Sequence, residues 1–153
     1  MLKSIRIQNF KSYKDSTLEL SPFTVLIGAN ASGKSNAIEA LRFLSILANG
    51  QKLSSFKYTV LNKDGGIRGG IDKLMFRHSN SCEFECSFDS EDSQILNIGL
   101  GIEDDELHIQ SEKLSQKKRH IPLYEIKHQS KSDITISYDN FAKGKQKKRP
   151  HLL

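Results

Sequence analysis

The segment from Gly28 to Ser35 constrains this chain more than any other part of its sequence. It reads GANASGKS and fits the pattern GxxxxGK[ST] at every fixed position. A chance match to those positions is expected roughly once in two hundred chains of this length. Val25 to Ile27 predict a short strand buried on both faces, and the residues after Ser35 have helical periodicity. Strand, glycine loop and helix, in that order, form the structural context that this motif requires.

The residue types in the loop suit a bound polyphosphate. Backbone N–H groups at the positive end of a helix can surround clustered negative charges. Gly28 and Gly33 let the loop bend and let the backbone come close to the ligand. Lys34 would place its ammonium against the β and γ phosphates, and the Ser35 hydroxyl would complete the shell of a Mg²⁺ ion. We therefore expect ATP and Mg²⁺ as cofactors, Lys34 as the catalytic residue and Ser35 as the metal ligand.

Alternating apolar residues before the loop predict a strand over Leu2 to Phe10. Lys11 to Asp15 is polar enough for a turn, and Ser16 to Leu20 alternates again, which predicts a hairpin partner. After the loop, apolar residues recur every three to four positions, and Asn49-Gly50 predicts the end of the helix. These helical positions are Ile38, Leu41, Leu44 or Ser45, and Leu47.

The second half of the chain changes to strand periodicity. Residues 63–70, KDGGIRGG, predict a turn or connector, with a second phosphate-cradling loop as the alternative. The alternating runs that follow predict an antiparallel meander with one apolar face. Its strands are expected at 82–88, 96–102, 107–110, 121–128 with a bulge, and 134–138.

Composition describes a chain of 153 residues with 37% hydrophobic and 27% charged residues, which suits a soluble protein. No apolar stretch approaches the roughly 18 residues of a membrane span, and the N-terminus lacks a signal-peptide run, so we expect a cytoplasmic protein with no membrane partner. The net charge of +5 equals the five lysines and arginines of residues 143–149. This basic tail is expected to be a disordered end, with contact to a nucleic-acid backbone as the alternative.

The remaining candidate groups favour structural roles. Cys82 and Cys86 lie too far apart on one strand to bridge, so we expect free buried thiols. The acidic run Glu103 to Glu106 predicts a solvated turn rather than a cation site, and the five histidines have no ligand spacing.

Two stretches of this sequence resemble a known family. LKSIRIQNFKSYKDSTLEL followed by FTVLIGANASGKSNAIEALRFL is similar to the N-terminus of the RecF/SMC/OLD group of ABC-type ATPases, and most closely to the bacterial AAA family ATPases of that group. The likeness rests on the NFKSY strand end, the G-x-N-x-S-G-K-S loop and the Asn-Ala-Ile helix start. It is strong over residues 1–50 and weaker over 51–142. The family loop usually has glycine where this chain has Ala31.

The resemblance implies that Lys11 and Ser12 lie near the nucleotide, that Asn30 faces the terminal phosphate, and that two ATPase heads sandwich ATP as a homodimer. It also brings to mind DNA repair and anti-phage defence, with nucleic acid as a partner. The expected nucleotide-binding residues are Gly28, Asn30, Ala31, Ser32, Gly33, Lys34, Ser35 and Asn36, together with Lys11 and Ser12.

Several parts of a complete ATPase are missing from the sequence. No apolar strand ends in an Asp-Glu pair, and no LSGG-like signature occurs. Phosphoryl transfer needs several such parts in place at once. We therefore expect an ATPase that works in the full-length, dimerised protein, with this chain inactive alone. The alternatives are a non-catalytic, ATP-binding regulatory module of a defence or toxin-type assembly and an ABC transporter ATPase subunit. A small-molecule kinase is disfavoured by the meander.

The predicted fold class is α/β in its α+β form. Residues 1–142 are expected to form an incomplete nucleotide-binding lobe of an ABC-type head, with a P-loop core at 1–66 and the β meander at 67–142. Residues 143–153 are expected to form the basic tail.

Overall fold

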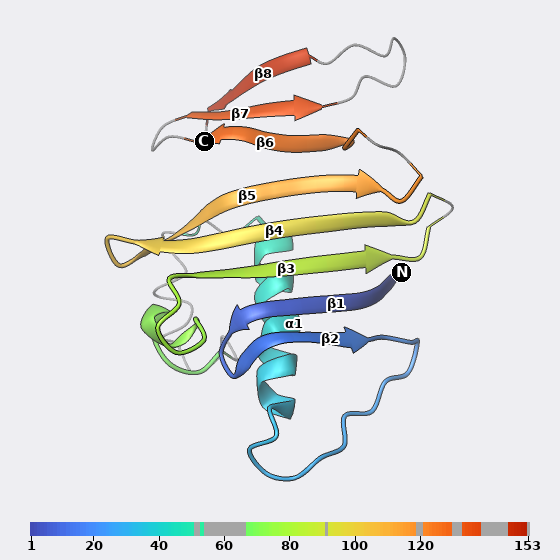
Figure 1. Ribbon diagram of the computed structural model, residues 1–153, viewed down its shortest axis with the longest axis vertical. Helices are drawn as coiled ribbons and strands as arrows, with labels where there is room; N and C mark the ends of the chain where they lie inside the picture. Colours follow the sequence, from blue (N-terminus) through green and yellow to red (C-terminus); the bar gives the residue numbers. More distant parts are fainter. Residues whose placement is uncertain are drawn as a thin grey trace.

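The computed structural model describes residues 1–50, 53, 67–90, 92–118, 121–129, 133–138 and 147–152. The described residues form an α+β domain: the alternating runs pair into one antiparallel sheet, and the run with helical periodicity forms a helix (Figure 1). Its elements are β1 (Leu2–Phe10), β2 (Tyr13–Glu19), α1 (Lys34–Ala48), the short 3₁₀ helix η2 (Ile71–Lys73), β3 (Ser81–Phe88), β4 (Gln94–Glu103), β5 (Glu106–Gln116), β6 (Tyr124–Gln129), β7 (Asp133–Tyr138) and β8 (Lys147–Leu152).

The sheet has eight strands in the order β2-β1-β3-β4-β5-β6-β7-β8. The N-terminal hairpin and the later meander are therefore continuous, because β1 pairs with β2 on one side and with β3 on the other. Ile7 lies opposite Phe84 across the β1–β3 ladder, so the apolar faces of both strands coincide. The predicted antiparallel meander is confirmed. The register of β6 shifts between Ile126 and His128, within the run for which the sequence admits a bulge.

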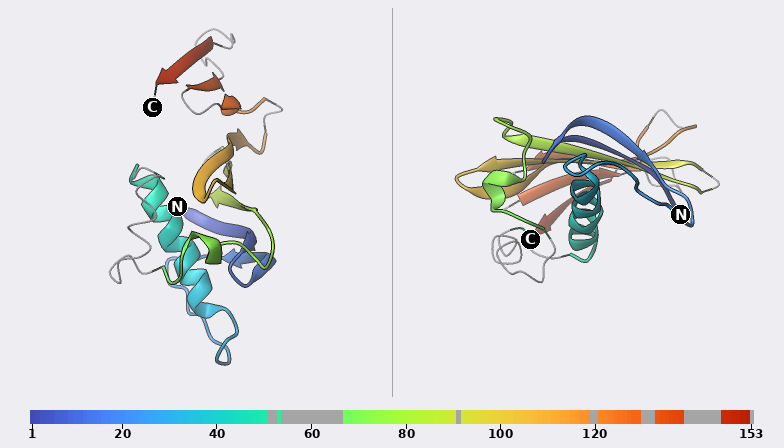
Figure 2. Two further views of the ribbon diagram at one scale, coloured as in Figure 1. Left: turned by 90° about the vertical axis from the view of Figure 1, so that its left-hand side faces the viewer. Right: turned by 90° about the horizontal axis from the view of Figure 1, so that it is seen from below.

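Helix α1 lies against one face of the sheet and crosses the strands at the β2 end of that sheet (Figures 1 and 2). Its N-terminus lies near the β2 edge, whereas β6, β7 and β8 extend beyond its C-terminus. The predicted stop at Asn49-Gly50 is confirmed, since Asn49 caps the helix and Gly50 takes a left-handed φ of 69°. Among the described residues, no helix is long and apolar enough to cross a bilayer.

The core fills the space between α1 and the strands nearest to it. Phe43 of α1 packs on Phe10 and Phe84, with ring centroids 5.7 and 5.6 Å away, and the latter two rings lie 5.3 Å apart. Ile5, Ile7 and Leu100 are fully buried in the same cluster. A three-ring contact thus holds α1 to the sheet.

Cys82 and Cys86 are free and buried on the core face of β3, as predicted. Burial raises the pKa of the Cys82 thiol to about 12 and that of Cys86 to about 11. The acidic run also forms the predicted turn, with Asp104 and Asp105 in left-handed conformations between β4 and β5. The two thiols thus pack in the core, and the acidic run connects two strands of the sheet.

The strand predicted over Val25 to Ile27 is wrong. The segment belongs to no strand, and none of the described strands pairs with it. Phe23 is 83% exposed and Ile27 is 91% exposed, so the apolar run is not covered by the described part of the chain. A strand is defined by its ladder partners as well as by its own residues, and an apolar run alone does not supply them.

The expectation of a disordered C-terminal end is wrong for residues 147–152. They form β8, which pairs antiparallel with β7, with Lys147 opposite Tyr138 and Leu152 opposite Asp133. The first part of the basic tail, residues 143–146, lies outside the described residues, as does residue 153. The density of charge in this segment therefore did not predict its structure, because pairing with β7 makes it a strand.

Candidate phosphate-binding loop

The loop before α1 leads into a helix start that has no side-chain cap among the described residues. Gly33 is the residue before the helix and has a left-handed φ of 96°, which glycine adopts without strain. No side chain of the described residues caps this helix start, and no acidic residue occurs in the first turn. The first N–H groups of a helix have no partner within the helix and lie at the positive end of its dipole, so this start can donate hydrogen bonds to an anion.

The side chain of Lys34 folds back across this loop. Its Nζ donates to the carbonyl oxygens of Gly28 at 2.5 Å and Ala29 at 2.6 Å, and lies 3.4 Å from Ser32 Oγ. A Cβ at Gly28 would lie 2.8 Å from Ser32 Oγ, so a side chain there would displace that hydroxyl. The ammonium thus lies beside the loop backbone, with exchangeable carbonyl partners.

The turn between β1 and β2 holds the loop from the other side. Tyr13 Oη donates to the Gly33 carbonyl at 3.0 Å, and Asn36 Nδ2 donates to Ser12 Oγ at 2.8 Å. A Cβ at Gly33 would lie 3.1 Å from Tyr13 Oη and 3.3 Å from Ser12 Oγ. Glycine suits this position because it avoids that crowding and adopts the left-handed φ without strain.

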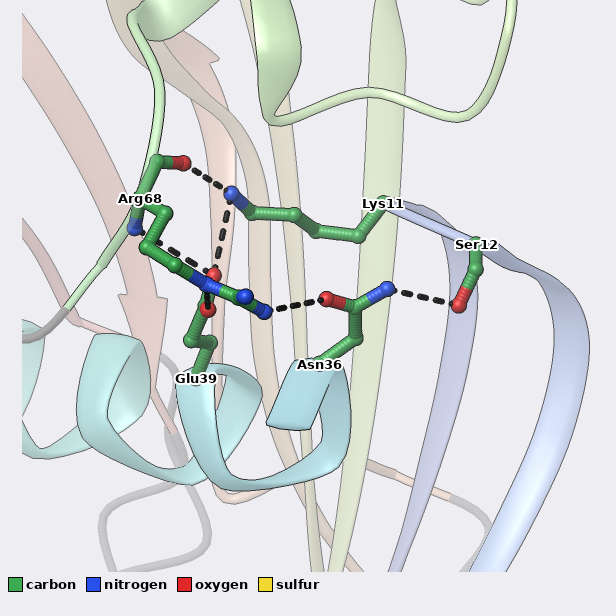
Figure 3. A network of polar contacts seen from close by, with 5 residues as sticks. All are labelled: Lys11, Ser12, Asn36, Glu39 and Arg68. Atoms are coloured by element: carbon green, nitrogen blue, oxygen red, sulfur yellow. Dashed lines mark hydrogen bonds and ion pairs between the residues drawn. The ribbon is translucent and has the colours of Figure 1, made fainter. Parts of the chain in front are cut away.

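A buried carboxylate lies one turn further along α1 (Figure 3). Glu39 is 3% exposed, and its Oε2 lies 3.0 Å from Lys11 Nζ while its Oε1 accepts from Arg68 Nε at 2.5 Å. Lys11 also donates to the Arg68 carbonyl, and Arg68 Nη2 lies 3.4 Å from Asn36 Oδ1. Burial acts to raise the pKa of Glu39, but the hydrogen bonds from Arg68 and Lys11 outweigh it and keep that pKa below its usual value.

Comparison with known protein families shows the family of this chain. The model of the AAA ATPase domain family matches residues 1–151, which is nearly the whole chain. The chain belongs to the AAA ATPase domain family.

Curated relatives of this AAA ATPase domain include two kinds of protein. The "DNA replication and repair protein RecF" of Gloeobacter violaceus is 29% identical over 99 residues, which cover 64% of this chain and 26% of the relative. The RecF of Clostridium botulinum is 46% identical over 46 residues, covering 29% and 13%. The "Chromosome partition protein Smc" of Methanocaldococcus jannaschii is 36% identical over 61 residues, covering 39% and 5%. The chain thus spans about a quarter or less of each relative, and the predicted resemblance to the RecF and SMC ATPases is confirmed.

In this AAA ATPase domain, the predicted loop residues occupy one continuous bend. Asn30 and Ala31 lie at its exposed turn, where Ala31 has a left-handed φ of 64°. Ser35 is exposed in the first turn of α1. Asn36 follows it and contacts Ser12, so these two predicted residues are brought together. Their contact with a nucleotide stays a prediction.

In the AAA ATPase domain, the described contacts of the Lys11 side chain are with residues outside the loop. This side chain is 9% exposed, and its ammonium pairs with Glu39 and the Arg68 carbonyl. The structure therefore directs this cation toward the second turn of α1. Whether it also reaches a nucleotide stays a prediction.

Sequence reasoning missed three residues of this region: Tyr13, Glu39 and Arg68. The signal for Glu39 was available, because it lies between Ala37 and Ala40 on the face of α1 that is buried in the AAA ATPase domain. A carboxylate on a buried helical face needs a cationic partner. The sequence offered no comparable signal for Tyr13, whose role depends on the hairpin register.

Proposed function

We propose that this AAA ATPase domain binds ATP with Mg²⁺ at residues 28–35. The observation that carries the proposal is the start of α1, which has no side-chain cap among the described residues. The left-handed Gly33 and the folded-back side chain of Lys34 lie at the same bend of the chain. Backbone donors at a helix N-terminus together with an ammonium group suit a polyphosphate. The family match supports nucleotide binding independently.

Each residue of the loop would have a separate part in binding. The first-turn amides would donate to phosphate oxygens, and Lys34 would exchange the Gly28 and Ala29 carbonyls for the β and γ phosphates. The exposed Ser35 hydroxyl would bind Mg²⁺, which neutralises phosphate charge when bound. Asn30 would face the terminal phosphate, and Ala31, Ser32 and Asn36 would complete the loop's contacts.

We further propose that the complete protein hydrolyses ATP when two ATPase heads meet around the nucleotide. The names of the RecF and Smc relatives support coupling to DNA, whereas a role in anti-phage defence stays a prediction. The chain's only adjacent aspartates after an apolar run, Asp104 and Asp105, occupy the β4–β5 turn. Hydrolysis would therefore need residues that this chain does not supply.

The first experiment measures nucleotide binding by calorimetry with Mg²⁺ and a non-hydrolysable ATP analogue. Lys34→Ala should weaken binding by about tenfold or more, because it removes a charge-assisted contact to phosphate. Lys14→Ala is the matched control, since Lys14 is an exposed lysine on β2 outside the loop. Unchanged affinity in Lys34→Ala would place the phosphate site elsewhere.

The second experiment measures hydrolysis by the complete protein with and without DNA. Wild type should turn over ATP, and Ser35→Ala should lose turnover together with Mg²⁺-dependent binding. Binding without turnover under both conditions would instead indicate the non-catalytic regulatory module. ATP turnover that is indifferent to DNA would remove the nucleic-acid coupling.

A further inference from the structure

Glu39 joins three segments that are distant in the sequence. Its carboxylate accepts from Lys11 in the β1–β2 turn and from both the side chain and the backbone N–H of Arg68, the latter at 3.4 Å. Arg68 belongs to the glycine-rich connector, of which residues 67–70 are described. A carboxylate this deeply buried is stable only when it is paired, so these contacts fix both the connector and Lys11 to α1.

The same cluster continues to the phosphate loop. Arg68 Nη2 reaches Asn36 Oδ1, and Asn36 Nδ2 reaches Ser12 Oγ beside Gly33 (Figure 3). Asn36 lies in the first helical turn, and no side chain in the described part of the chain caps the start of that turn. A continuous chain of polar contacts therefore leads from the connector to the donors of the loop.

The charges of the cluster explain why Glu39 decides this arrangement. Lys11 and Arg68 are both cations, and both are held within 3.0 Å of the one carboxylate. Without its negative charge, a nearly buried ammonium and a guanidinium would be left close together and would repel each other. The Arg68 side chain is 71% exposed and can leave toward solvent, whereas Lys11 is enclosed. The connector is thus the part that would detach.

We propose that Glu39 is a positioning residue that couples the 67–70 connector to the phosphate loop. Nucleotide binding would fix Asn36 and thereby hold Arg68 on Glu39, and a detached connector would weaken nucleotide binding. The two effects must be equal in free energy, because coupling between sites is reciprocal. This inference rests on the proposed nucleotide site, but the docking of the connector can be measured without nucleotide.

The test compares wild type with Glu39→Gln in the complete protein. Hydrogen exchange of residues 67–70 reports on the connector, and calorimetry with Mg²⁺ and the non-hydrolysable analogue reports on the loop. In wild type, the analogue should slow exchange of the connector amides. In Glu39→Gln, these amides should exchange faster without nucleotide, the analogue should no longer slow them, and affinity should fall by about tenfold, within the range typical of coupled sites.

Two further variants make the result specific. Glu83→Gln removes an exposed carboxylate from β3 and should leave both readouts unchanged. Arg68→Ala removes a largely exposed side chain, so it tests the coupling even if Glu39→Gln does not fold. Arg68→Ala should reproduce the loss of affinity, and combining it with Glu39→Gln should add little, since both act through one contact.

Several outcomes would overturn the coupling while leaving the phosphate site intact. These are normal affinity in both Glu39→Gln and Arg68→Ala, additive losses in the double variant, and connector exchange that does not respond to nucleotide in wild type. If Lys34→Ala also leaves affinity unchanged, the phosphate site itself is wrong. Faster connector exchange in nucleotide-free Glu39→Gln would then still support the docking of the connector by Glu39.

Discussion

Gly33 shows how much of the candidate site depends on a single residue. Its φ of 96° is available to glycine, and its missing side chain admits both Tyr13 Oη and Ser12 Oγ. The hydrogen bond from Tyr13 to its carbonyl then fixes the point at which α1 begins. The motif residues in the loop and the aromatic residue in the hairpin act together.

We predict that Gly33→Ala lowers the free energy of unfolding by more than Gly50→Ala does. Both positions have left-handed φ values, which cost an alanine about 1–2 kcal/mol. At Gly50 a Cβ would meet no atom of the described residues within 4 Å, whereas at Gly33 it would also crowd Tyr13. Urea denaturation measures both costs. Equal losses at the two positions would contradict the close contact described here.

The ion pairs of Glu39 predict a pH dependence of stability. The lowered pKa of its carboxyl means that the ionised form stabilises the fold above the ordinary value of 4.5, and that this contribution is lost as pH falls through the lowered pKa. Glu39→Gln should therefore cost about 3 kcal/mol at neutral pH, because it leaves the buried Lys11 ammonium without a counter-ion. The difference in the free energy of unfolding between wild type and Glu39→Gln should become smaller in acid. A difference that stays constant down to about pH 3 would contradict this assignment.

At the scale of elements, alternation along the chain was sufficient to predict most of the sheet. The predicted strand over Leu2 to Phe10 has the bounds of β1, and the runs around Phe84 and Ile98 became β3 and β4. Local pattern could not show which strand pairs with which. For that reason it predicted a strand at 25–27, where no described partner exists, and missed the pairing of β8 with β7.

The candidate site divides in the same way. The loop residues follow a spacing that is visible in the sequence, and so does the helix that begins at Lys34. The contacts of Glu39 with Lys11 and Arg68 join residues 28 and 29 positions apart, and only the folded chain brings them together. Sequence therefore predicted the part of the site that is local and missed the part that is assembled.

The packing of α1 on the sheet predicts a large effect for one aromatic residue. Phe43→Ala should lower the free energy of unfolding by about 3–5 kcal/mol, because it removes a fully buried ring from contact with Phe10 and Phe84. Phe23→Ala is the matched control, since Phe23 is largely exposed, and it should change stability by less than about 0.5 kcal/mol. Denaturation of both variants measures the difference, and similar losses would show that Phe23 is also buried.

At the scale of the whole molecule, α1 covers only the β2 end of the sheet (Figure 1). Beside that end, the extended segment before the loop exposes Phe23, Val25 and Ile27. Because no described strand pairs with this exposed apolar segment, it is prone to associate with another chain. The cytoplasmic location predicted from sequence stays a prediction.

We predict that Ile27→Lys reduces self-association of this chain without loss of stability. Ile27 is almost fully exposed, so the substitution removes apolar surface and should change the free energy of unfolding by less than about 0.5 kcal/mol. Light scattering across a concentration series measures association, and Thr24→Lys is a control for added charge at a neighbouring exposed position. Equal association of wild type and Ile27→Lys would show that the chain does not self-associate through this segment.

The tight hairpin that places Phe10 opposite Tyr13 limits how the N-terminus of this protein can evolve. One inserted residue in that hairpin would turn the tyrosine to the opposite side of the sheet and separate its hydroxyl from the bend before α1. Insertions and deletions should thus be rarer there than in other surface turns, even though the hairpin itself lies outside the glycine-lysine motif.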